Sequence, residues 1–260
     1  MLSSSLPSMN IPQLDIDEII DRSEQGKTLP FICRAEDDHL YFVKGRDAGR
    51  RSQIIELICG QLAWSFGLDI AAFAIVNVPE ALILPAFRHD ISDLGAGMAF
   101  GSQALPHVQE LNIAQLQSAL RADEISDRIA KDIFMFDWWI QNGDRTLTSL
   151  GGNPNLLWDC EAKRLVVIDH NCAFDPEFCG RSALELHVFA DAGRAVFDDL
   201  AERAHYLERF SVALAAFNVA CDNVPPEWWW VDDGVPTNFD RDVAKAMLAR
   251  FNSAIFWKED

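Results

Sequence analysis

The sequence predicts an α+β fold of two lobes, and three features of its patterning lead to this prediction. Apolar runs typical of strands, with one long helix among them, fill the first 86 residues. After about residue 108 the pattern is mainly helical and is interrupted by one hairpin. Between these parts, "LGAGMAFGSQAL" has the glycine content of a linker. We therefore expect a small β-rich lobe at about 1–86, a linker at about 87–107 and a larger helical lobe at about 108–260, with ligands in the cleft between lobes.

The elements of the first lobe each have a local signal. "LDIDEIIDRSEQG" has apolar residues near helical spacing before Gly26, which predicts a short leading helix. "LPFICRAEDDHLYFVKG" predicts two strands around the turn-forming "AEDDH", and residues 70–86 predict two more. "RSQIIELICGQLAWSFG" predicts a helix that ends at Gly67. Its apolar stripe consists of Ile54, Ile58, Leu62 and Phe66.

Charge and cysteine content restrict the partners and the compartment. The chain has 22 Lys and Arg residues against 40 Asp and Glu, a formal net charge of -18. Such a surface repels phosphate backbones and anionic headgroups, so we expect no nucleic acid and no membrane partner, whereas a basic protein suits it. The six cysteines include no C-x-x-C pair, and the N-terminus "MLSSSLPSMN" lacks the pattern of a signal peptide. We expect reduced thiols and a cytoplasmic location.

The segment with the strongest chemical signal is "QNGDRTLTSLGGNPNLL", which follows the apolar helical run "DIFMFDWWI". It places Asp144 just after the helix, where a carboxylate beside metal-bound phosphates can orient an attacking hydroxyl or accept its proton. The alternative interpretation is that Asp144 and Arg145 are solvated residues after a helix that Asn142 and Gly143 terminate.

The hairpin "NLLWDCEAKRLVVID" brings an amide and a carboxylate together. If its turn centres on Glu161–Lys163, Asn155 lies opposite Asp169, and directly paired residues have Cβ atoms about 4.5–5.5 Å apart. Carboxylate and carboxamide oxygens at that spacing can share one Mg²⁺ ion. Asn153, two residues earlier on the same side of the strand, is an alternative ligand. A turn of different length would break the pairing.

A lysine and a glutamate in the first lobe suggest a phosphate-binding pair. Lys44 ends the strand "LYFVK", and Glu56 lies on the next helix, on a small and polar face away from the apolar stripe. A strand lysine held by a glutamate of the following helix is the arrangement that places a kinase lysine on the phosphates of a nucleotide. The alternative is an ordinary exposed lysine at a strand end.

The order of these signals resembles the compact HipA-like kinases, relatives of the HipA toxin kinases. The segments that carry the resemblance are "YFVKG", "GAGMAFGS", "FDWWIQNGDRT", "NPNLLWD" and "LVVIDHNCAF", within residues 41–174. It implies a two-lobed, protein-kinase-like (HipA-like) fold and an ATP- and Mg²⁺-dependent serine/threonine kinase with a protein substrate. A toxin–antitoxin setting, with an antitoxin-like regulator, is what the family suggests.

The resemblance also implies roles for particular residues. Lys44 would contact the phosphates with Glu56 as its partner, and Asp144 would be the catalytic base. Asn155 and Asp169, with Asn153 as the alternative, would bind Mg²⁺. Backbone groups of Pro85, Ala86 and Phe87 would form the hinge that meets the adenine.

Two departures from the family pattern leave alternatives open. The loop between Asp144 and Asn155 carries the extra residues "LTSLGG", and the turn expected to cover the phosphates, "CRAEDDH", has no glycine and three acidic residues. The alternatives are a pseudokinase that acts as a nucleotide-binding interaction module, or a kinase of small-molecule or lipid headgroup hydroxyls.

Overall fold

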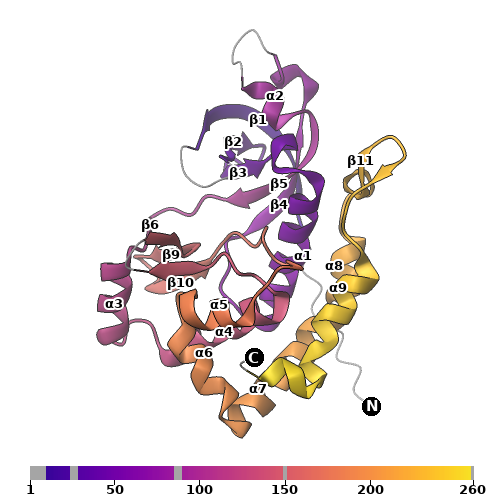
Figure 1. The fold of residues 1–260 in the computed structure, drawn as a ribbon. Helices are drawn as coiled ribbons and strands as arrows, with labels where there is room; N and C mark the ends of the chain where they lie inside the picture. The colour runs from indigo at the N-terminus through magenta and orange to yellow at the C-terminus, as the bar shows by residue number, and fades with distance from the viewer. Residues whose placement is uncertain (1–9, 24–28, 85–89, 149–150, 259–260) are drawn as a thin grey trace. The chain divides into compact units, whose positions relative to one another are not determined.

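The computed structural model describes residues 10–23, 29–84, 90–148 and 151–258 (Figure 1). The chain divides into two compact units, each built from separate stretches of sequence. Unit 1 comprises Met1–Ile58, Ala71–Pro106 and Val219–Phe239, and unit 2 comprises Cys59–Ile70, His107–Asn218 and Asp240–Asp260. Helices and strands occur in both, so the prediction of an α+β chain is confirmed. No helix in the described stretches is long and apolar enough to cross a membrane.

Unit 1 is organised around a closed five-stranded barrel in the order β1-β2-β3-β5-β4. Its strands are β1 (Gln13–Arg22), β2 (Phe31–Ala35), β3 (Leu40–Lys44), β4 (Phe73–Val78) and β5 (Gly97–Gln103). Neighbouring strands are antiparallel except β1 and β4, which are parallel and close the barrel. Inward side chains such as Phe31, Val43 and Val76 are fully buried and form its core. The remaining elements are η1 (Arg46–Ala48), η2 (Glu80–Leu82), α2 (Ile91–Leu94), η3 (Pro226–Trp229), β11 (Trp230–Asp232) and β12 (Val235–Pro236).

Unit 2 is mainly helical and also contains two small sheets. One sheet has the order β10-β9-β6, and the other pairs β7 with β8. The strands are β6 (Val108–Glu110), β7 (Thr146–Thr148), β8 (Gly151–Asn153), β9 (Leu156–Asp159) and β10 (Arg164–Val167). The helices are α3 (Ile113–Arg121), α4 (Asp127–Ile140), α5 (Gly180–Leu186), α6 (Ala190–Phe197), α7 (Leu200–Ala215), α9 (Arg241–Leu248), η4 (Ala249–Asn252) and η5 (Ala254–Trp257). Two further helices, α1 (Arg50–Phe66) and α8 (Phe217–Asp222), contain the boundary between the units.

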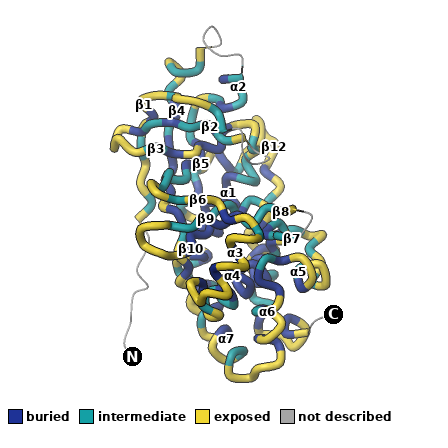
Figure 2. The backbone as a smooth tube through the Cα atoms, turned by 90° about the vertical axis from the view of Figure 1, so that its left-hand side faces the viewer, coloured by how far each residue is buried: buried dark blue, intermediate teal, exposed yellow. Residues whose placement is uncertain are grey.

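Helix α1 agrees closely with its prediction. It starts at Arg50, ends at Phe66, and is followed by Gly67 with a φ of 93°, a left-handed conformation that glycine adopts without strain. All four residues of the predicted apolar stripe are buried. The helix is dark blue along most of its length in Figure 2 because its second face is also buried.

The leading helix was a wrong prediction, because residues 13–22 form strand β1. The pairing of β1 with β2 shifts register twice, between Ile16 and Glu18 and again between Ile19 and Asp21. Each irregularity inserts an extra residue into the alternation, so Ile16 and Ile19 both pack on the barrel core three positions apart. That spacing resembles the periodicity of a helix, although β1 pairs as a strand with β2 on one side and with β4 on the other.

Two other predictions for this region also require correction. Only one strand, β4, is found in the described part of residues 70–86, since Glu80–Leu82 form the short 3-10 helix η2. The predicted linker contains β5, which pairs with both β3 and β4. Gly101 serves close packing, because a Cβ added there would lie 2.9 Å from Cγ1 of Val76. The glycine content of this segment led to the prediction of a linker, but residues 97–103 form a tightly packed strand.

Helix α4 positions the segment that carries Asp144. Ser126 caps its N-terminus by accepting a hydrogen bond from the Ile129 amide at 3.3 Å. The helix is buried continuously from Ile133 to Ile140, and the indole of Trp139 donates to the Leu248 carbonyl at 2.8 Å. Gln141, with φ 54° and ψ 53°, ends the helix in the left-handed region and turns the chain. This buried helix gives the loop that follows it a fixed starting point.

Candidate active site

Lys44 and Glu56 form a buried ion pair within unit 1. Lys44 is the last residue of β3 and is 8% exposed, Glu56 on α1 is 3% exposed, and the ammonium donates a hydrogen bond to Oε1 of the carboxylate. The neighbouring Gln53 fixes the end of the strand, because its amide donates to the carbonyls of Lys44 and Gly45 at 2.7 and 3.0 Å. The alternative of an ordinary exposed lysine is therefore excluded. Because residues 13–22 form β1, β3 is the third strand among the described residues, and the third strand is the one that carries the lysine in protein kinases.

Asp144 in unit 2 lies beside both candidate asparagines. It is half-buried, and its Oδ2 accepts hydrogen bonds from Nδ2 of Asn153 at 3.5 Å and Nδ2 of Asn155 at 3.4 Å. The extra residues between Asp144 and Asn155 include most of the hairpin β7–β8. After this hairpin the chain lies beside Asp144 again, through Asn153. Because both amides approach the same oxygen, Asn153 and Asn155 both remain candidates.

The predicted register of the β9–β10 hairpin is wrong by one residue. Asp159 pairs with Arg164 and Leu156 with Val167, so the turn centres between Glu161 and Ala162. Asn155 is consequently paired with Ile168, and the Ile168 amide donates a hydrogen bond to the Asn155 carbonyl at 3.1 Å. Asp169 lies one residue beyond this pair. The turn is set by Asp159, whose Oδ1 accepts the amides of Glu161 and Ala162.

Asn155 and Asp169 share an unusual backbone conformation. Their φ angles are 47° and 57°, in the left-handed region that Asn and Asp tolerate best among residues with a side chain. Asn155 directly precedes β9, and Asp169 lies two residues after the end of β10. These residue types therefore have a backbone role as well as oxygen atoms suited to a cation.

Arg145 connects the loop of Asp144 to both of these strands. It is fully buried, and its Nη1 donates to the carbonyls of Asn155 at 2.6 Å and of Pro154 and Ile168 at 3.2 Å. One guanidinium nitrogen thus joins the residue before β9 to the residue before Asp169. This side chain, together with the β9–β10 pairing, holds the backbone at Asn155 and Ile168 in place, so the alternative of a solvated Arg145 is excluded.

The charge of Arg145 is balanced inside unit 2 by Asp137. The Nε of Arg145 donates to Oδ2 of Asp137 at 2.5 Å, and this carboxylate is 1% exposed. It also accepts hydrogen bonds from Asn142 Nδ2 at 2.9 Å and from His187 Nε2 at 3.0 Å. Burial alone would raise the pKa of Asp137, but Arg145 and His187 outweigh it and lower the pKa below its usual range.

His187 is held in its neutral form. Its Nδ1 accepts the Phe189 amide at 3.0 Å, so the single ring proton is on Nε2 and is donated to Asp137. Burial lowers the pKa of His187, and the Arg145 charge lowers it further, although Asp137 acts in the opposite direction. The network therefore contains one cation, one anion and one neutral imidazole.

Sequence reasoning missed this network, although a signal was present. Asp137 is the one charged residue within "IFMFDWWI", and an acidic side chain on an otherwise apolar buried helix requires a partner. Arg145, eight residues later, was the available cation. His187 had no comparable signal because it is distant in the sequence.

The oxygen atoms near Asp144 are of the type that Mg²⁺ prefers. Among the described residues, no group of three or more His, Cys, Asp and Glu side chains is placed to hold a metal. The ligands predicted from the sequence are instead the amides of Asn155 and Asn153 and the carboxylate of Asp169, and the two amides lie beside Asp144. Both amides donate through nitrogen, which leaves their oxygen atoms as acceptors. Hard oxygen donors in this number fit a magnesium ion that retains several waters.

Two further predictions concern the nucleotide. Pro85, Ala86 and Phe87, predicted to form the hinge, lie outside the described residues. The turn "AEDDH" connects β2 with β3 rather than the first two strands of the chain. Its acidic residues have local roles, since Asp37 accepts hydrogen bonds from the Tyr41 hydroxyl at 2.8 Å and the His39 amide at 3.1 Å. Glu36 accepts the Asp15 amide at 3.2 Å.

Together these features define a class of protein. A barrel lysine paired with a helix glutamate, and an aspartate surrounded by asparagines after a buried helix, are the groups that kinases use to hold and transfer a phosphoryl group. Comparison with known proteins agrees with this class. A family model described as HipA-like kinase matches residues 16–260, and the chain belongs to that family.

Solved structures include a protein of similar fold. The chain is similar to the crystal structure of the Helicobacter pylori proinflammatory kinase CtkA, with a TM-score of 0.53 and 12% sequence identity. The match covers 92% of this chain and 96% of that one, and at this identity it concerns the fold alone. A search of curated proteins gave no match. Family membership supports phosphotransferase activity in general.

Proposed function

We propose that this protein transfers the terminal phosphate of ATP to a serine or threonine hydroxyl, most simply on a protein, in a magnesium-dependent reaction. The observation that carries the proposal is the contact of Asp144 with Asn153 and Asn155, in a chain that also has the buried Lys44–Glu56 pair. In this proposal, unit 1 and unit 2 correspond to the small and large lobes of a kinase.

Each residue has a defined task in the reaction. Lys44 neutralises phosphate charge, and Glu56 holds its ammonium in place. Asp144 orients the acceptor hydroxyl and takes its proton while the hydroxyl oxygen bonds to the terminal phosphorus, the bond to the bridging oxygen breaks, and ADP leaves. Asn155, Asn153 and Asp169 would hold Mg²⁺, which when bound neutralises charge on the phosphate oxygens.

The test uses the intact protein incubated with ATP and Mg²⁺. ATP at about 100 times its Kd should stabilise the fold by about 2.7 kcal/mol, seen as a rise in melting temperature. Asp169→Ala should lose the Mg²⁺-dependent part of that rise. Asp144→Ala should keep it but transfer no phosphate to the protein itself or to added acceptors, as measured by intact mass. Asp198→Ala, which removes an exposed carboxylate of unit 2, is the matched control.

The outcomes separate the alternatives. If saturating ATP produces no shift in the wild type, nucleotide binding and the proposal both fail. A shift without any transfer, in wild type and Asp144→Ala alike, would instead identify a pseudokinase. Transfer confined to small-molecule or lipid hydroxyls would retain the kinase and reject the protein acceptor.

A further inference from the structure

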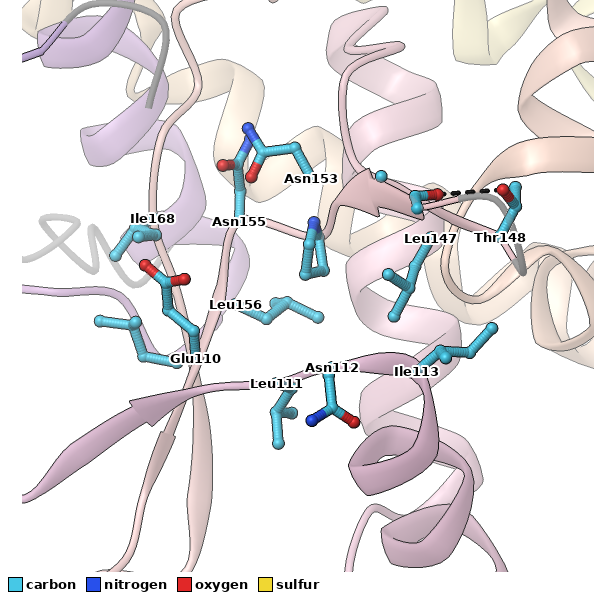
Figure 3. A pocket seen from close by; sticks show the side chains of 14 residues that line it. Glu110, Leu111, Asn112, Ile113, Leu147, Thr148, Asn153, Asn155, Leu156 and Ile168 are labelled. Carbon is cyan, nitrogen blue, oxygen red and sulfur yellow. Dashed lines mark hydrogen bonds between the residues drawn. The ribbon is translucent and has the colours of Figure 1, made fainter. Parts of the chain in front are cut away.

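A surface of unit 1 contains none of the candidate catalytic residues and still has the features of a binding site. It is the ribbon of β11 and β12, residues 230–236, whose first strand is labelled in Figure 1. The pocket of about 550 Å³ in unit 2 differs from it, because Asn153 and Asn155 line that pocket and their amide groups lie close together (Figure 3). That pocket therefore belongs to the proposed phosphate and magnesium site.

The ribbon exposes large apolar side chains. Every residue from Trp230 to Pro236 is exposed, and the exposed fractions are 50% for Trp230, 61% for Val231 and 52% for Val235. Single exposed apolar residues are ordinary on a protein surface, but several of them together are typical of an interaction site. A two-stranded ribbon without a covering layer is also only marginally stable by itself. A partner that covers the ribbon would therefore stabilise it.

The base of the ribbon is fixed to the barrel of unit 1. Trp228 is fully buried, and its indole donates a hydrogen bond to the Met98 carbonyl of β5 at 3.0 Å. The Glu227 carboxylate accepts the Met98 amide at 3.1 Å. Beyond the second strand, the Thr237 hydroxyl donates to the Trp228 carbonyl at 2.6 Å, and its amide donates to the Trp229 carbonyl at 2.9 Å. A ribbon held in this way has little backbone entropy to lose when a partner binds.

The outer edge of β11 can accept a further strand. Among the strands of the described residues, β11 and β12 pair only with each other. An unpaired strand edge can form backbone hydrogen bonds with an extended segment of another protein. The edge of β12 is less suitable, because Pro236 has no amide hydrogen to donate. The edge of β11 is therefore the better site for strand addition.

The charge around the ribbon selects the chemistry of the partner. Asp232 and Asp233 lie at its turn, and the segment Val219–Phe239 contains four exposed acidic residues and no Lys, Arg or His. Basic side chains of a partner would be attracted to these carboxylates. A second copy of the chain would instead bring like charges together, and anionic headgroups would be repelled. The favoured occupant is therefore a basic protein segment.

We propose that the ribbon is a docking surface for a partner protein, which adds an extended segment with apolar and basic residues along β11. The apolar side chains of that segment pack on Trp230 and Val231, and its Lys or Arg side chains contact Asp232 and Asp233. This binding goes beyond phosphate transfer and does not depend on it.

The experiment selects binders to the intact wild-type protein from a library of random linear peptides. The selected peptides should be enriched in apolar residues and in Lys or Arg, and their affinities are measured by fluorescence anisotropy. Trp230→Ala should weaken binding about 30-fold or more, because an aromatic anchor is lost. Asp232→Asn combined with Asp233→Asn should weaken it about 2- to 30-fold, the effect of two exposed charge pairs, and should reduce its salt dependence.

Matched variants alter the same kinds of residue elsewhere. Val231→Ser should weaken binding, whereas Val243→Ser on α9, where the valine is 65% exposed, should not. Asp17→Asn combined with Glu208→Gln, which removes two exposed carboxylates outside the ribbon, is the control for charge. All of these variants should keep a melting temperature near that of the wild type, because the altered side chains are exposed.

Several results would overturn the docking surface. They are a selection that enriches no peptide, enrichment of acidic or uncharged peptides, and peptides that bind Trp230→Ala as tightly as the wild type. A wild-type dimer in sedimentation that Trp230→Ala dissociates would make a second copy the occupant. Binding to phosphatidylcholine vesicles that Trp230→Ala abolishes would make the ribbon a membrane contact. None of these measurements uses ATP, so failure of the docking surface and failure of the proposed kinase function are distinguishable.

Discussion

Removal of Arg145 should destabilise the protein far more than removal of an exposed arginine in an ion pair of the same kind. In Arg145→Ala, Asp137 stays buried at 1% exposure without its cation, and the carbonyls of Asn155 and Ile168 lose the hydrogen bonds that Arg145 donates. Breaking a buried ion pair from one side costs about 3–5 kcal/mol. Since domains of this size have about 5–15 kcal/mol of stability in total, the variant should fold but be marginal.

The matched control is Arg164→Ala. Arg164 contacts Asp69 at 2.7 Å in the same unit, but the two side chains are 44% and 53% exposed. Exposed pairs contribute about 0–1 kcal/mol, so the free energy of unfolding should change little. Urea unfolding followed by tryptophan fluorescence measures both variants. Equal losses below about 1 kcal/mol would refute the view that Arg145 holds the loop through buried charge.

Three further predictions follow from other contacts. In the double variant Lys44→Met with Glu56→Leu, the free energy of unfolding should stay within about 1 kcal/mol of the wild-type value, because apolar residues can replace a buried ion pair. The same variant should transfer no phosphate. Gly193→Ala should lose about 1–3 kcal/mol of stability by urea unfolding, since its Cβ would overlap the ring of buried Phe134. Stability should fall as pH decreases below about 6.5, where an unfolded histidine binds a proton that buried His187, with its lowered pKa, does not. His187→Gln should reduce this acid sensitivity in urea unfolding measured at several pH values.

Each of these predictions can fail in a specific way. Phosphate transfer by the double variant would remove Lys44 from the catalytic machinery. Wild-type stability in Gly193→Ala would mean that α6 can move away from α4 at no cost. An unchanged pH profile in His187→Gln would assign the acid sensitivity to other groups.

The elements predicted correctly from sequence are those whose patterns depend on local periodicity. The α1 stripe repeats over four turns and ends at a glycine, and each buried stripe residue confirms it. Strand β1 was missed because two register irregularities, visible only when β2 is paired with it, disturb its alternation. Strand β5 was missed because Gly101 is required by the side chain of Val76 across the barrel, which the local sequence does not contain.

The candidate site also has features that the sequence predicts and features that only the structure shows. Lys44, Glu56, Asp144, Asn153 and Asn155 could be nominated from residue type and order, and the structure forms the Lys44–Glu56 pair and the Asp144–asparagine contacts within their own units. The adjacency of Asn155 and Asp169 could be expected from the hairpin, but its register could not, because the Asp159 turn fixes it.

The sequence by itself determined the class of chain and the chemical groups available to it, because apolar periodicity and the order of Lys, Glu, Asp and Asn are properties of the linear chain. Only the tertiary structure decided which polar groups are buried together. Arg145 follows Asp137 by eight residues, but His187 is 50 residues from Asp137 in the sequence, and the three form one network because buried charged and polar groups need partners inside the fold.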